Sequence, residues 1–455
     1  MPAPVNAGAR LDRLPIGPFH YRVITLIGIG MFFDGFDIYV GGTVLAATLK
    51  SGFSTLAGNA QFISATFLGM MIGAGLAGFL GDRFGRRFTY QANLLVFGLA
   101  SIAAAFAPDM AILLACRFVM GVGLGAENVV GYATLAEFVP AQSRGRWQGL
   151  MAVFVVTSLP ISSFLGYTIV PALGWRALFV IGGLGALVVW YLRKRLPESP
   201  RWLEAAGRGA EAETLLRAIE ATVPYGAALP EPTPIAAPPA ADLAMLFRPP
   251  LLARLVLGCV CLVVINTLLY GFVTWLPSFF VRQGLSIAAS FGYTLLMACG
   301  APIGAAIGAL TADRWGRRPT IIGASALAVV LGAVYPSISD PALLTLAGFA
   351  LTIPIYVLVA LLFGIYIPEL FPTEIRLRGA GLCNMVGRGA TIATPFGVVA
   401  LFNYGGVAAV MSLMVALLLL QIAAVFWFGI EPARRPLEEL QPEPAPDARP
   451  VYVES

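Results

Sequence analysis

The chain has 455 residues, of which 58% are hydrophobic and 12% are charged, and its mean hydropathy is +0.83. A soluble protein of this length would carry about 25% charged residues, so the composition excludes a soluble enzyme and indicates an integral membrane protein. The net charge of +5 would suggest an anionic partner in a soluble protein. In a membrane protein the placement of the basic residues matters more, and we expect no nucleic-acid partner.

Twelve apolar stretches follow one another along the chain, and each is long enough to cross a bilayer, which takes ~20 apolar residues. The predicted spans are residues 22–48, 58–81, 87–107, 110–138, 147–170, 174–195, 251–279, 287–312, 319–338, 341–367, 379–403 and 407–430. Stretches of this length are helical, because barrel strands would alternate over about ten residues. The predicted fold class is therefore all-α, a polytopic membrane protein with twelve transmembrane helices.

The polar stretches divide the chain into five predicted parts. They are a cytoplasmic N-terminus (1–21), an N-terminal six-helix bundle (22–195), a cytoplasmic central loop (196–250), a C-terminal six-helix bundle (251–430) and a disordered cytoplasmic tail (431–455). Within the central loop, Ser199 to Ala221 can form a short amphipathic helix, and the Pro/Ala-rich stretch from Ala227 to Ala241 is typical of a flexible connector.

The basic residues predict the orientation of these spans. Even-to-odd connections together with both termini carry 24 of them, whereas the other side carries only Lys50, Arg176 and Arg282. Because basic residues accumulate on the cytoplasmic side, both termini and the central loop are predicted to be cytoplasmic, in a multi-pass protein of the cell (inner) membrane.

An internal repeat predicts how the spans are grouped. The motif Asp-Arg-x-Gly-Arg-Arg that begins at Asp82 returns at Asp313, 231 residues later. The motif Glu137-Phe-Val-Pro returns as Glu369-Leu-Phe-Pro, 232 residues later. Two motifs that recur at offsets differing by a single residue predict two six-helix bundles. Because an even number of spans separates the bundles, they form a parallel repeat.

These paired loop motifs resemble the signature of the major facilitator superfamily, and the resemblance covers essentially the whole chain. The Pro-Glu-Ser-Pro-Arg-Trp run that begins at Pro197 is similar to the sugar-porter-like branch. Asp34-Gly-Phe-Asp37 in the first span resembles the motif of aromatic acid:proton symporters, and Glu127-Asn128 is similar to nicotinate-transporter relatives. The resemblance implies the major facilitator fold and secondary transport by alternating access.

Five charged residues fall well inside the predicted spans, away from their ends: Asp34, Asp37, Glu127, Arg117 and Arg388. Burying one such group costs roughly 2.5 to 3.5 kcal/mol on insertion scales, so a chain keeps it where it meets water, a partner or a substrate. We therefore expect these groups to face a polar pathway, although aspartates merely paired to a neighbouring helix are the alternative. Three acids against two arginines leave one negative charge, which a proton could cancel.

Arg117 on the fourth span is the predicted partner of the first-span aspartates. If this pair opens when the bundles rock, the acid loses its counter-ion and takes up a proton. By likeness to proton-linked sugar porters, the predicted proton-coupling residues are Asp37 with Arg117, together with Asp34 and Glu127. A permanent structural ion pair is the alternative.

Arg388 on the eleventh span is the predicted substrate residue. It corresponds to Val156 in the repeat, and an unrepeated guanidinium suits an anionic substrate, because its planar fork pairs with a carboxylate. In the aromatic-acid symporters an arginine of this region is functionally important, which the resemblance carries onto Arg388. The alternative is a structural partner for a carbonyl group or for Glu127. Further candidate pocket residues are Asn384, Asn266, Tyr270, Phe36, Tyr132, Tyr356, Thr157 and Trp275.

Charged residues at the loop motifs predict a cytoplasmic gate that closes when the bundles meet and separates when they part. Each exposed pair would contribute ~1 kcal/mol or less, but several together could bias a near-balanced equilibrium. The alternative is that these charges only set the orientation. The predicted gate residues are Asp82, Arg86, Glu137, Arg144, Glu198, Asp313, Arg317, Glu369 and Arg376.

The predicted function is a proton-coupled symporter, not an enzyme, that imports a small organic acid such as a benzoate-type acid or nicotinate. The chain lacks a phosphate-binding loop, so an ion gradient must drive uphill transport, with protons as the coupling ion and with neither a cofactor nor a metal. Alternatives are sugar or polyol symport, efflux by proton antiport, and a transport-inactive receptor. We expect the partners to be the lipid bilayer and a small anionic molecule, and the protein to be a monomer.

Overall fold

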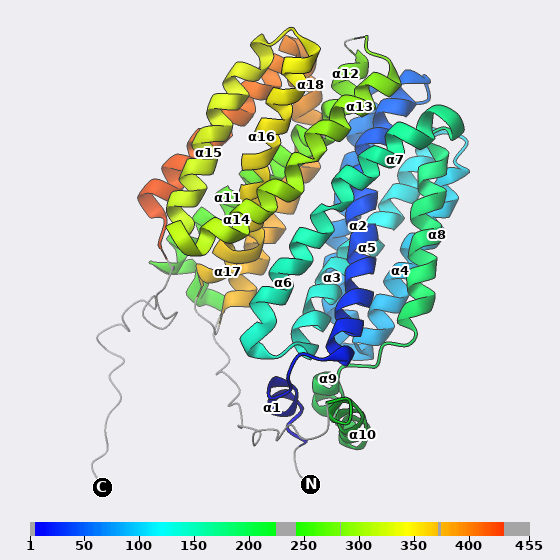
Figure 1. Cartoon of the computed structure of the whole chain (residues 1–455), viewed down its shortest axis with the longest axis vertical. Coiled ribbons are helices and arrows are strands. Elements are labelled where there is room, and N and C mark those ends of the chain that lie inside the picture. Colours follow the sequence, from blue (N-terminus) through cyan, green and yellow to red (C-terminus); the bar gives the residue numbers. More distant parts are fainter. Residues whose placement is uncertain (1–4, 224–242, 283, 372–374, 432–455) are drawn as a thin grey trace.

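The computed structural model describes residues 5–223, 243–282, 284–371 and 375–431, and these ranges contain helices and no strand. Figure 1 shows two groups of long helices side by side, the first coloured blue to green and the second green to red. The spanning helices of the first half are α2 (Pro18–Lys50), α3 (Leu56–Phe84), α4 (Arg86–Ala105), α5 (Met110–Phe138), α6 (Ala141–Val156), α7 (Ser158–Leu173) and α8 (Arg176–Arg193).

The second half repeats this pattern. Its elements are α11 (Leu251–Gly271), η2 (Val273–Trp275), α12 (Leu276–Arg282), α13 (Ile287–Ala298), α14 (Gly300–Trp315), α15 (Arg317–Val334), η3 (Tyr335–Ser337), α16 (Pro341–Leu361), η4 (Leu362–Tyr366), α17 (Ile367–Glu369) and α18 (Arg376–Phe428). Five spans are each built from consecutive helical segments: α6 with α7, α11 with η2 and α12, α13 with α14, α15 with η3, and α16 with η4 and α17.

Twelve spans result once α18 is divided. Eleven described stretches are long and apolar enough to cross a membrane, and the last of them covers 51 residues. Gly405 and Gly406 have non-helical dihedral angles, and Gly406 lies at φ +62°, so α18 turns there into two antiparallel spans. The prediction of an all-α protein with twelve spans is confirmed.

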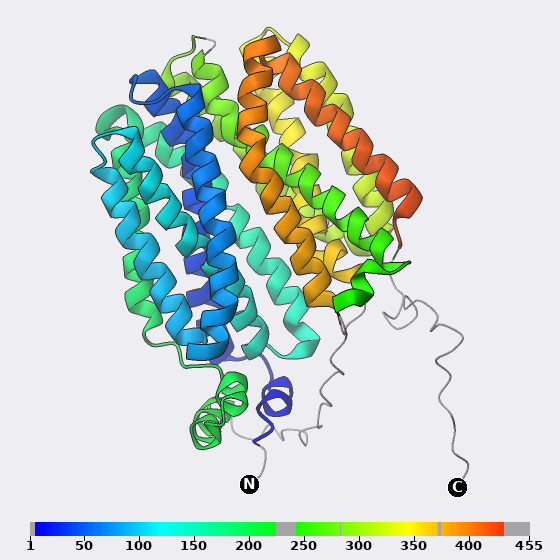
Figure 2. The same cartoon turned by 180° about the vertical axis from the view of Figure 1, so that it is seen from behind.

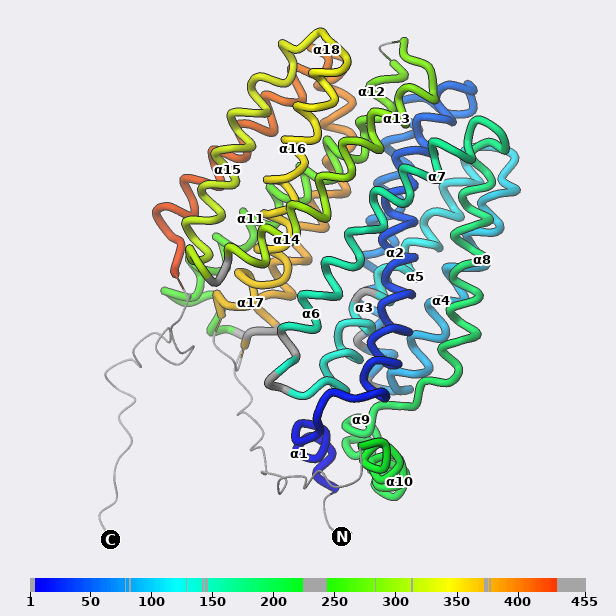
Figure 3. The backbone as a smooth tube through the Cα atoms, viewed as in Figure 1, coloured from blue at the N-terminus to red at the C-terminus, as the bar shows by residue number. Residues whose placement is uncertain are grey.

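The two halves meet along a junction of several helix pairs. Helix α3 packs against α18, α7 against α13, and α2 against α12. Figure 2 shows the first of these pairs from behind, and the tube in Figure 3 shows the path of the chain through both halves. The short helices α1 (Ala7–Asp12), α9 (Pro200–Ala205) and α10 (Gly209–Glu220) lie beneath the first half, at what we call the α9 end. The opposite end, where α12 lies, is the α12 end.

Glycines set the close approach of α3 and α5 in the first half. A Cβ atom at Gly73 would lie 2.0 Å from the carbonyl oxygen of Val122, and one at Gly125 would lie 2.0 Å from that of Met70. Only glycine leaves room for such backbone contact, which is the packing mode of small residues in membrane helices. The α3–α5 contact holds Arg117 of α5 against the junction.

The connection after α8 folds into two helices rather than one, because Gly207 adopts φ +77° between α9 and α10. Helix α1 was not predicted, and it docks on this pair. Arg10 forms an ion pair with Glu220 at 2.7 Å, and Arg201 forms one with Asp12 at 2.8 Å. The predicted connector at 227–241 and most of the predicted tail lie outside the described residues.

Candidate functional site

The predicted ion pair between α2 and α5 is present. Arg117 Nη1 donates to Asp37 Oδ2 at 2.6 Å, and both residues are 2% exposed. Arg117 Nε also donates to Thr66 Oγ1 at 3.1 Å, and the guanidinium lies 4.5 Å from the centre of the Phe62 ring. These contacts fix the guanidinium on three sides and direct one of its nitrogens to the carboxylate.

This pair lies at the junction of the two halves. Arg117 lines a cavity of about 20 Å³, enough for a single water molecule, together with Ile38, Gly41, Phe62, Ile63, Thr66, Phe67, Tyr270 and Thr274. Residues up to Arg117 belong to the first half, whereas Tyr270 and Thr274 belong to the second. Directly beside it, Phe67 and Tyr270 make an edge-to-face contact at 4.3 Å. Ser64 Oγ donates to the Ile392 carbonyl across the junction at 2.7 Å.

Arg388 lies on the second-half side of the same region. It is partly buried, and its guanidinium interacts electrostatically with Tyr270. Within the described part of the chain it makes neither a hydrogen bond nor an ion pair, so a structural pairing with Glu127 is not observed. The guanidinium is therefore free to meet a ligand.

Tyr270, which interacts with Arg388, belongs to a group of three tyrosines from both halves. Tyr39 of α2, Tyr270 of α11 and Tyr356 of α16 interact electrostatically with one another through their hydroxyls. Tyr39 was missed from the sequence, although the repeat carried the signal, because Tyr39 and Tyr270 are 231 residues apart, the offset of the first loop motif. The two tyrosines are thus equivalent residues of the two halves.

The two predicted asparagines lie in the second half, near Arg388. Asn266 Nδ2 donates to the Leu262 carbonyl at 2.7 Å, and Asn384 Nδ2 donates to the Ala380 carbonyl at 2.9 Å. A Cβ atom at Gly387 would lie 2.8 Å from Asn266 Nδ2, so the amide fills the space left by that glycine. Both amides are thus held by the turn of helix before them.

Two predicted pocket residues do not join this site. Phe36 is 2% exposed and packs within the first half, against Phe33 and beside Gly182 of α8. A helix turns by about 100° per residue, which directs Phe36 away from the face of Asp37. Tyr132 packs against the cluster that contains Ile27, also within the first half. This structure does not bring these two residues to Arg388 and Tyr270, and their role in substrate binding stays a prediction.

A second buried ion pair, which the sequence did not predict, lies in the first half. Arg193 at the end of α8 pairs with Glu127 of α5 and is 1% exposed, although it is one of the 24 basic residues predicted to lie on the cytoplasmic side. Arg193 also donates to the carbonyl groups of Leu26 at 2.9 Å and Ile27 at 2.8 Å. The expected excess of one negative charge is therefore wrong, because three acids face three arginines.

Asp34, the remaining predicted coupling residue, lies near this second pair. It is 2% exposed, and neither of its carboxyl oxygens has a hydrogen-bond partner within the described part of the chain. It interacts electrostatically with Glu127, Arg193 and Asp37. Asp34 thus differs from Asp37, which has its own arginine.

The predicted gate residues of the first half form contacts within that half. Arg86 pairs with Glu137 at 2.9 Å, and Glu198 accepts hydrogen bonds from the backbone N–H groups of Arg86 at 2.9 Å and Arg87 at 3.1 Å. Glu198 therefore caps the first turn of α4, where unpaired N–H groups attract a carboxylate.

The second half carries the same network. Arg317 pairs with Glu369 at 3.0 Å, and Glu431 caps α15 by accepting from the backbone N–H groups of Arg317 and Arg318. Glu431 was missed, although it occupies the position of Glu198 in the repeat. Among the described residues no ion pair crosses between the halves, and the side chains of Asp82, Arg144, Asp313 and Arg376 lie outside them.

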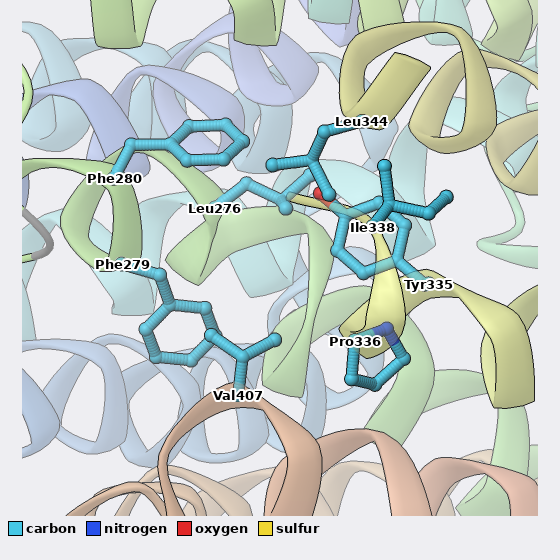
Figure 4. Close-up of a pocket in the computed structure, with 8 residues that line it drawn as sticks. All are labelled: Leu276, Phe279, Phe280, Tyr335, Pro336, Ile338, Leu344 and Val407. Carbon is cyan, nitrogen blue, oxygen red and sulfur yellow. The ribbon is translucent and has the colours of Figure 1, made fainter. Parts of the chain in front are cut away.

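A second cavity, of about 80 Å³, lies at the α12 end of the second half (Figure 4). Its lining residues are Leu276, Phe279, Phe280, Tyr335, Pro336, Ile338, Leu344 and Val407. The Tyr335 hydroxyl is the one polar side-chain group of this lining. An apolar cavity without a charged group does not suit a carboxylate.

Known proteins share both the sequence and the fold of this chain. The family model of the Major Facilitator Superfamily matches residues 27–395. An inner membrane metabolite transport protein of Escherichia coli, YdjE, is 37% identical over 95% of this chain and 98% of its own length. The niacin transporter NiaP of Acinetobacter baylyi is 32% identical over 95% of this chain and 99% of its own. The xylose transporter XylE of Escherichia coli, in a partially occluded inward open conformation, superimposes with a TM-score of 0.72 at 18% identity, over 91% of this chain and 99% of its own.

The match to the family model and the whole-length relatives agree with the twelve spans and with the repeated loop motifs. The relatives are named as transport proteins. The chain therefore belongs to the Major Facilitator Superfamily, and it is a multi-pass membrane transporter of small metabolites and not an enzyme.

Proposed function

We propose that this transporter is a proton-coupled symporter that imports a small organic acid, an aromatic or heteroaromatic carboxylate, by alternating access. The observation that carries this proposal is Arg388, a partly buried guanidinium that has no counter-ion among the described residues and interacts with Tyr270, one of three tyrosines from both halves. The protein would act as a monomer in the cell inner membrane, with the α9 end in the cytoplasm, because the basic residues accumulate at that end.

The chemistry of this region favours an anion over a sugar. A guanidinium at membrane depth is costly unless an anion meets it, and its fork matches a carboxylate in two parallel hydrogen bonds. The rings of Tyr39, Tyr270 and Tyr356 can pack against an aromatic substrate edge to face, and their hydroxyls can donate to it. A sugar would leave the charge of Arg388 uncompensated. The relative named as a niacin transporter supports the same class, because niacin is a pyridine carboxylate.

Proton coupling would use the pair beside the same cavity. Asp37 and Arg117 are joined here, and a proton on Asp37 would release Arg117 when the halves move relative to each other. Because the pair touches the lining shared with Tyr270, substrate entry and release of the pair would take place in one region. Protonation of Asp37 and binding of substrate would thus favour the same movement of the two halves relative to each other.

The contacts along the junction support a state closed at the α12 end. The stretch from Trp275 to Val281 is buried, and a Cβ atom at Gly42 would lie 2.5 Å from the Thr274 carbonyl oxygen. Toward the α9 end, Gly75 of α3 and Gly381 of α18 are exposed, with no atom within 4 Å of an added Cβ. A substrate in this state would leave toward the cytoplasm.

Uptake into proteoliposomes tests the proposal. Labelled benzoate, nicotinate and xylose are offered to vesicles with an imposed inward proton gradient. We expect both acids to accumulate, a protonophore to abolish the accumulation, and xylose to remain at the level of empty vesicles. Accumulation of xylose would instead support sugar symport, and expulsion of a preloaded acid by the inward gradient would support efflux; either result would contradict the proposal.

A further inference from the structure

The ion pair between Glu127 and Arg193 has no equivalent in the second half. In the repeat, 232 residues later, Glu127 corresponds to Val359 and Arg193 to Val425. Both halves have the same arrangement of helices, so the fold itself does not require this pair. A charged pair inside a membrane bundle that the repeat does not share points to a task of the first half alone.

The surroundings of Arg193 are built to hold a guanidinium. Each of its three side-chain nitrogens donates a hydrogen bond: Nη1 to the carboxylate of Glu127, and Nε and Nη2 to the carbonyl groups of Leu26 and Ile27 in α2. Gly30 of α2 provides the space, since a Cβ atom there would lie 2.0 Å from Arg193 Nη2. The contacts keep Oε1 of Glu127 paired with Arg193, whereas Oε2 has no hydrogen-bond partner among the residues that the structure describes.

Every arginine near Asp34 is already paired. The charged groups around Asp34 are Asp37 on its own helix, Glu127 on α5 and Arg193 on α8. Arg117 is paired with Asp37, and Arg193 with Glu127. An ionised Asp34 would therefore be a buried carboxylate without a counter-ion, next to another carboxylate. The neutral acid avoids both penalties.

We propose that Asp34 carries a proton in this conformation, and that Arg193 is the positioning residue that places it there by keeping Glu127 ionised. The step is a simple protonation: an O–H bond forms at Asp34, and the hydronium ion that supplies the proton becomes water. The link to transport rests on the proposed function: the proton carried in symport would be bound at Asp34 while Arg117 remains on Asp37, and it would pass from Asp34 to Asp37 when that ion pair opens.

Infrared spectroscopy of the purified protein tests the location of this proton. A protonated carboxyl group gives a carbonyl-stretch band that an ionised one lacks. We expect wild-type protein to show such a band, and ¹³C-carboxyl labelling of aspartate to shift it. Asp34→Asn should remove the band, and Asp37→Asn should keep it. Absence of the band, a shift with labelled glutamate only, or a band retained in Asp34→Asn would overturn the inference. Even if the variants fold poorly, the labelled wild-type protein decides whether an aspartate carries the proton; Asp34 and Asp37 are the two buried aspartates of the described residues, and Asp37 is paired with Arg117.

Two glycine-to-alanine substitutions, one beside Arg193 and one as its control, test the role of Arg193 without changing a charge. Gly30→Ala would displace the guanidinium from Glu127, so we expect a second band that responds to labelled glutamate. Gly75→Ala, on an exposed helix position with open space, should give the wild-type spectrum. A wild-type spectrum in Gly30→Ala would overturn the role of Arg193. These spectra are recorded without substrate and without a gradient, so they do not depend on which substrate the protein transports. Failure of the proton assignment at Asp34 can therefore be distinguished from failure of the proposed transport of an organic acid.

Discussion

Arg388 is the residue on which the assignment of an anionic substrate depends. Arg388→Ala should weaken binding of the transported acid by roughly tenfold to hundredfold, because a hydrogen bond to a charged group contributes about 1.5 to 3 kcal/mol. Binding of labelled acid to the purified protein measures the change. Arg146→Ala, at an exposed arginine of α6, is the matched control and should bind as the wild type does. Unchanged affinity in Arg388→Ala would contradict the assignment.

Asp37 tests the coupling device separately from binding. Asparagine keeps the shape of the side chain and can still accept the hydrogen bond from Arg117 Nη1, but it cannot take up a proton. Asp37→Asn should therefore lose accumulation driven by a proton gradient, down to the equilibrium level, and retain exchange of labelled for unlabelled acid. Both are measured in proteoliposomes. Accumulation at the wild-type level would show that Asp37 is not the coupling residue.

Residues within apolar stretches could be placed from the sequence, and residues at the ends of such stretches could not. Asp37 and Arg117 were paired correctly, because isolated charges at membrane depth need a partner. Arg193 was missed since it precedes Lys194 and Arg195, and a basic run at a helix end resembles a loop. The burial of Arg193 depends on the space beside Gly30 of another helix. A contact between two helices leaves no recognisable pattern in the sequence around Arg193.

At the scale of elements, α1 is held to the connection after α8 by ion pairs. Arg10 joins Glu213 and Glu220, and its hydrogen bonds hold the pKa of Glu220 below its usual range. Arg10→Ala should lower the stability of the protein by about 1 kcal/mol at neutral pH, since these pairs are partly exposed to solvent. Thermal unfolding measures this difference. Arg208→Ala, whose pair with Glu211 is solvent-exposed, is the control and should unfold as the wild type does.

The pH dependence of that difference has a definite sign. A carboxyl group with a lowered pKa in the folded state stabilises it above the usual carboxyl pKa of 4.5, and the contribution is lost as the pH falls through the lowered value. The gap between wild type and Arg10→Ala should therefore be full at neutral pH and shrink below pH 4.5. A gap that is constant with pH would mean that α1 is held by its apolar contacts, such as that of Leu11.

The long membrane-spanning helices could be predicted from hydropathy, whereas the short helices could not. All twelve spans were predicted, because burial in lipid requires continuous apolar length. Helix α1 has six residues, which is too short for a helix to be stable alone, so its contacts with α10 stabilise it. The break at Phe272 between α11 and η2 was missed for a similar reason, as the run of apolar residues continues through it.

At the scale of the whole molecule, the two halves share one plan and differ where the chemistry lies. Glu198 and Glu431 cap equivalent helices, and Tyr39 and Tyr270 lie at equivalent positions. The charged groups are divided instead: Asp37 and Arg117 belong to the first half, and Arg388 to the second. A proton site and an anion site on opposite sides of a junction would both respond to movement of one half against the other.

Gly42 tests whether the α12 end opens. Any side chain there would meet the Thr274 backbone, with Cβ only 2.5 Å from the carbonyl oxygen, so the halves could not close at this point. In Gly42→Ala, a cysteine placed at buried Ser278 should therefore react with a membrane-impermeant maleimide from the α12 side, in a background without the five native cysteines. Gly41→Ala is the matched control: its Cβ would meet Arg117 and Phe62 at an ordinary 3.8 Å, and the cysteine should stay protected. Equal labelling in both variants would show that this contact does not seal the α12 end.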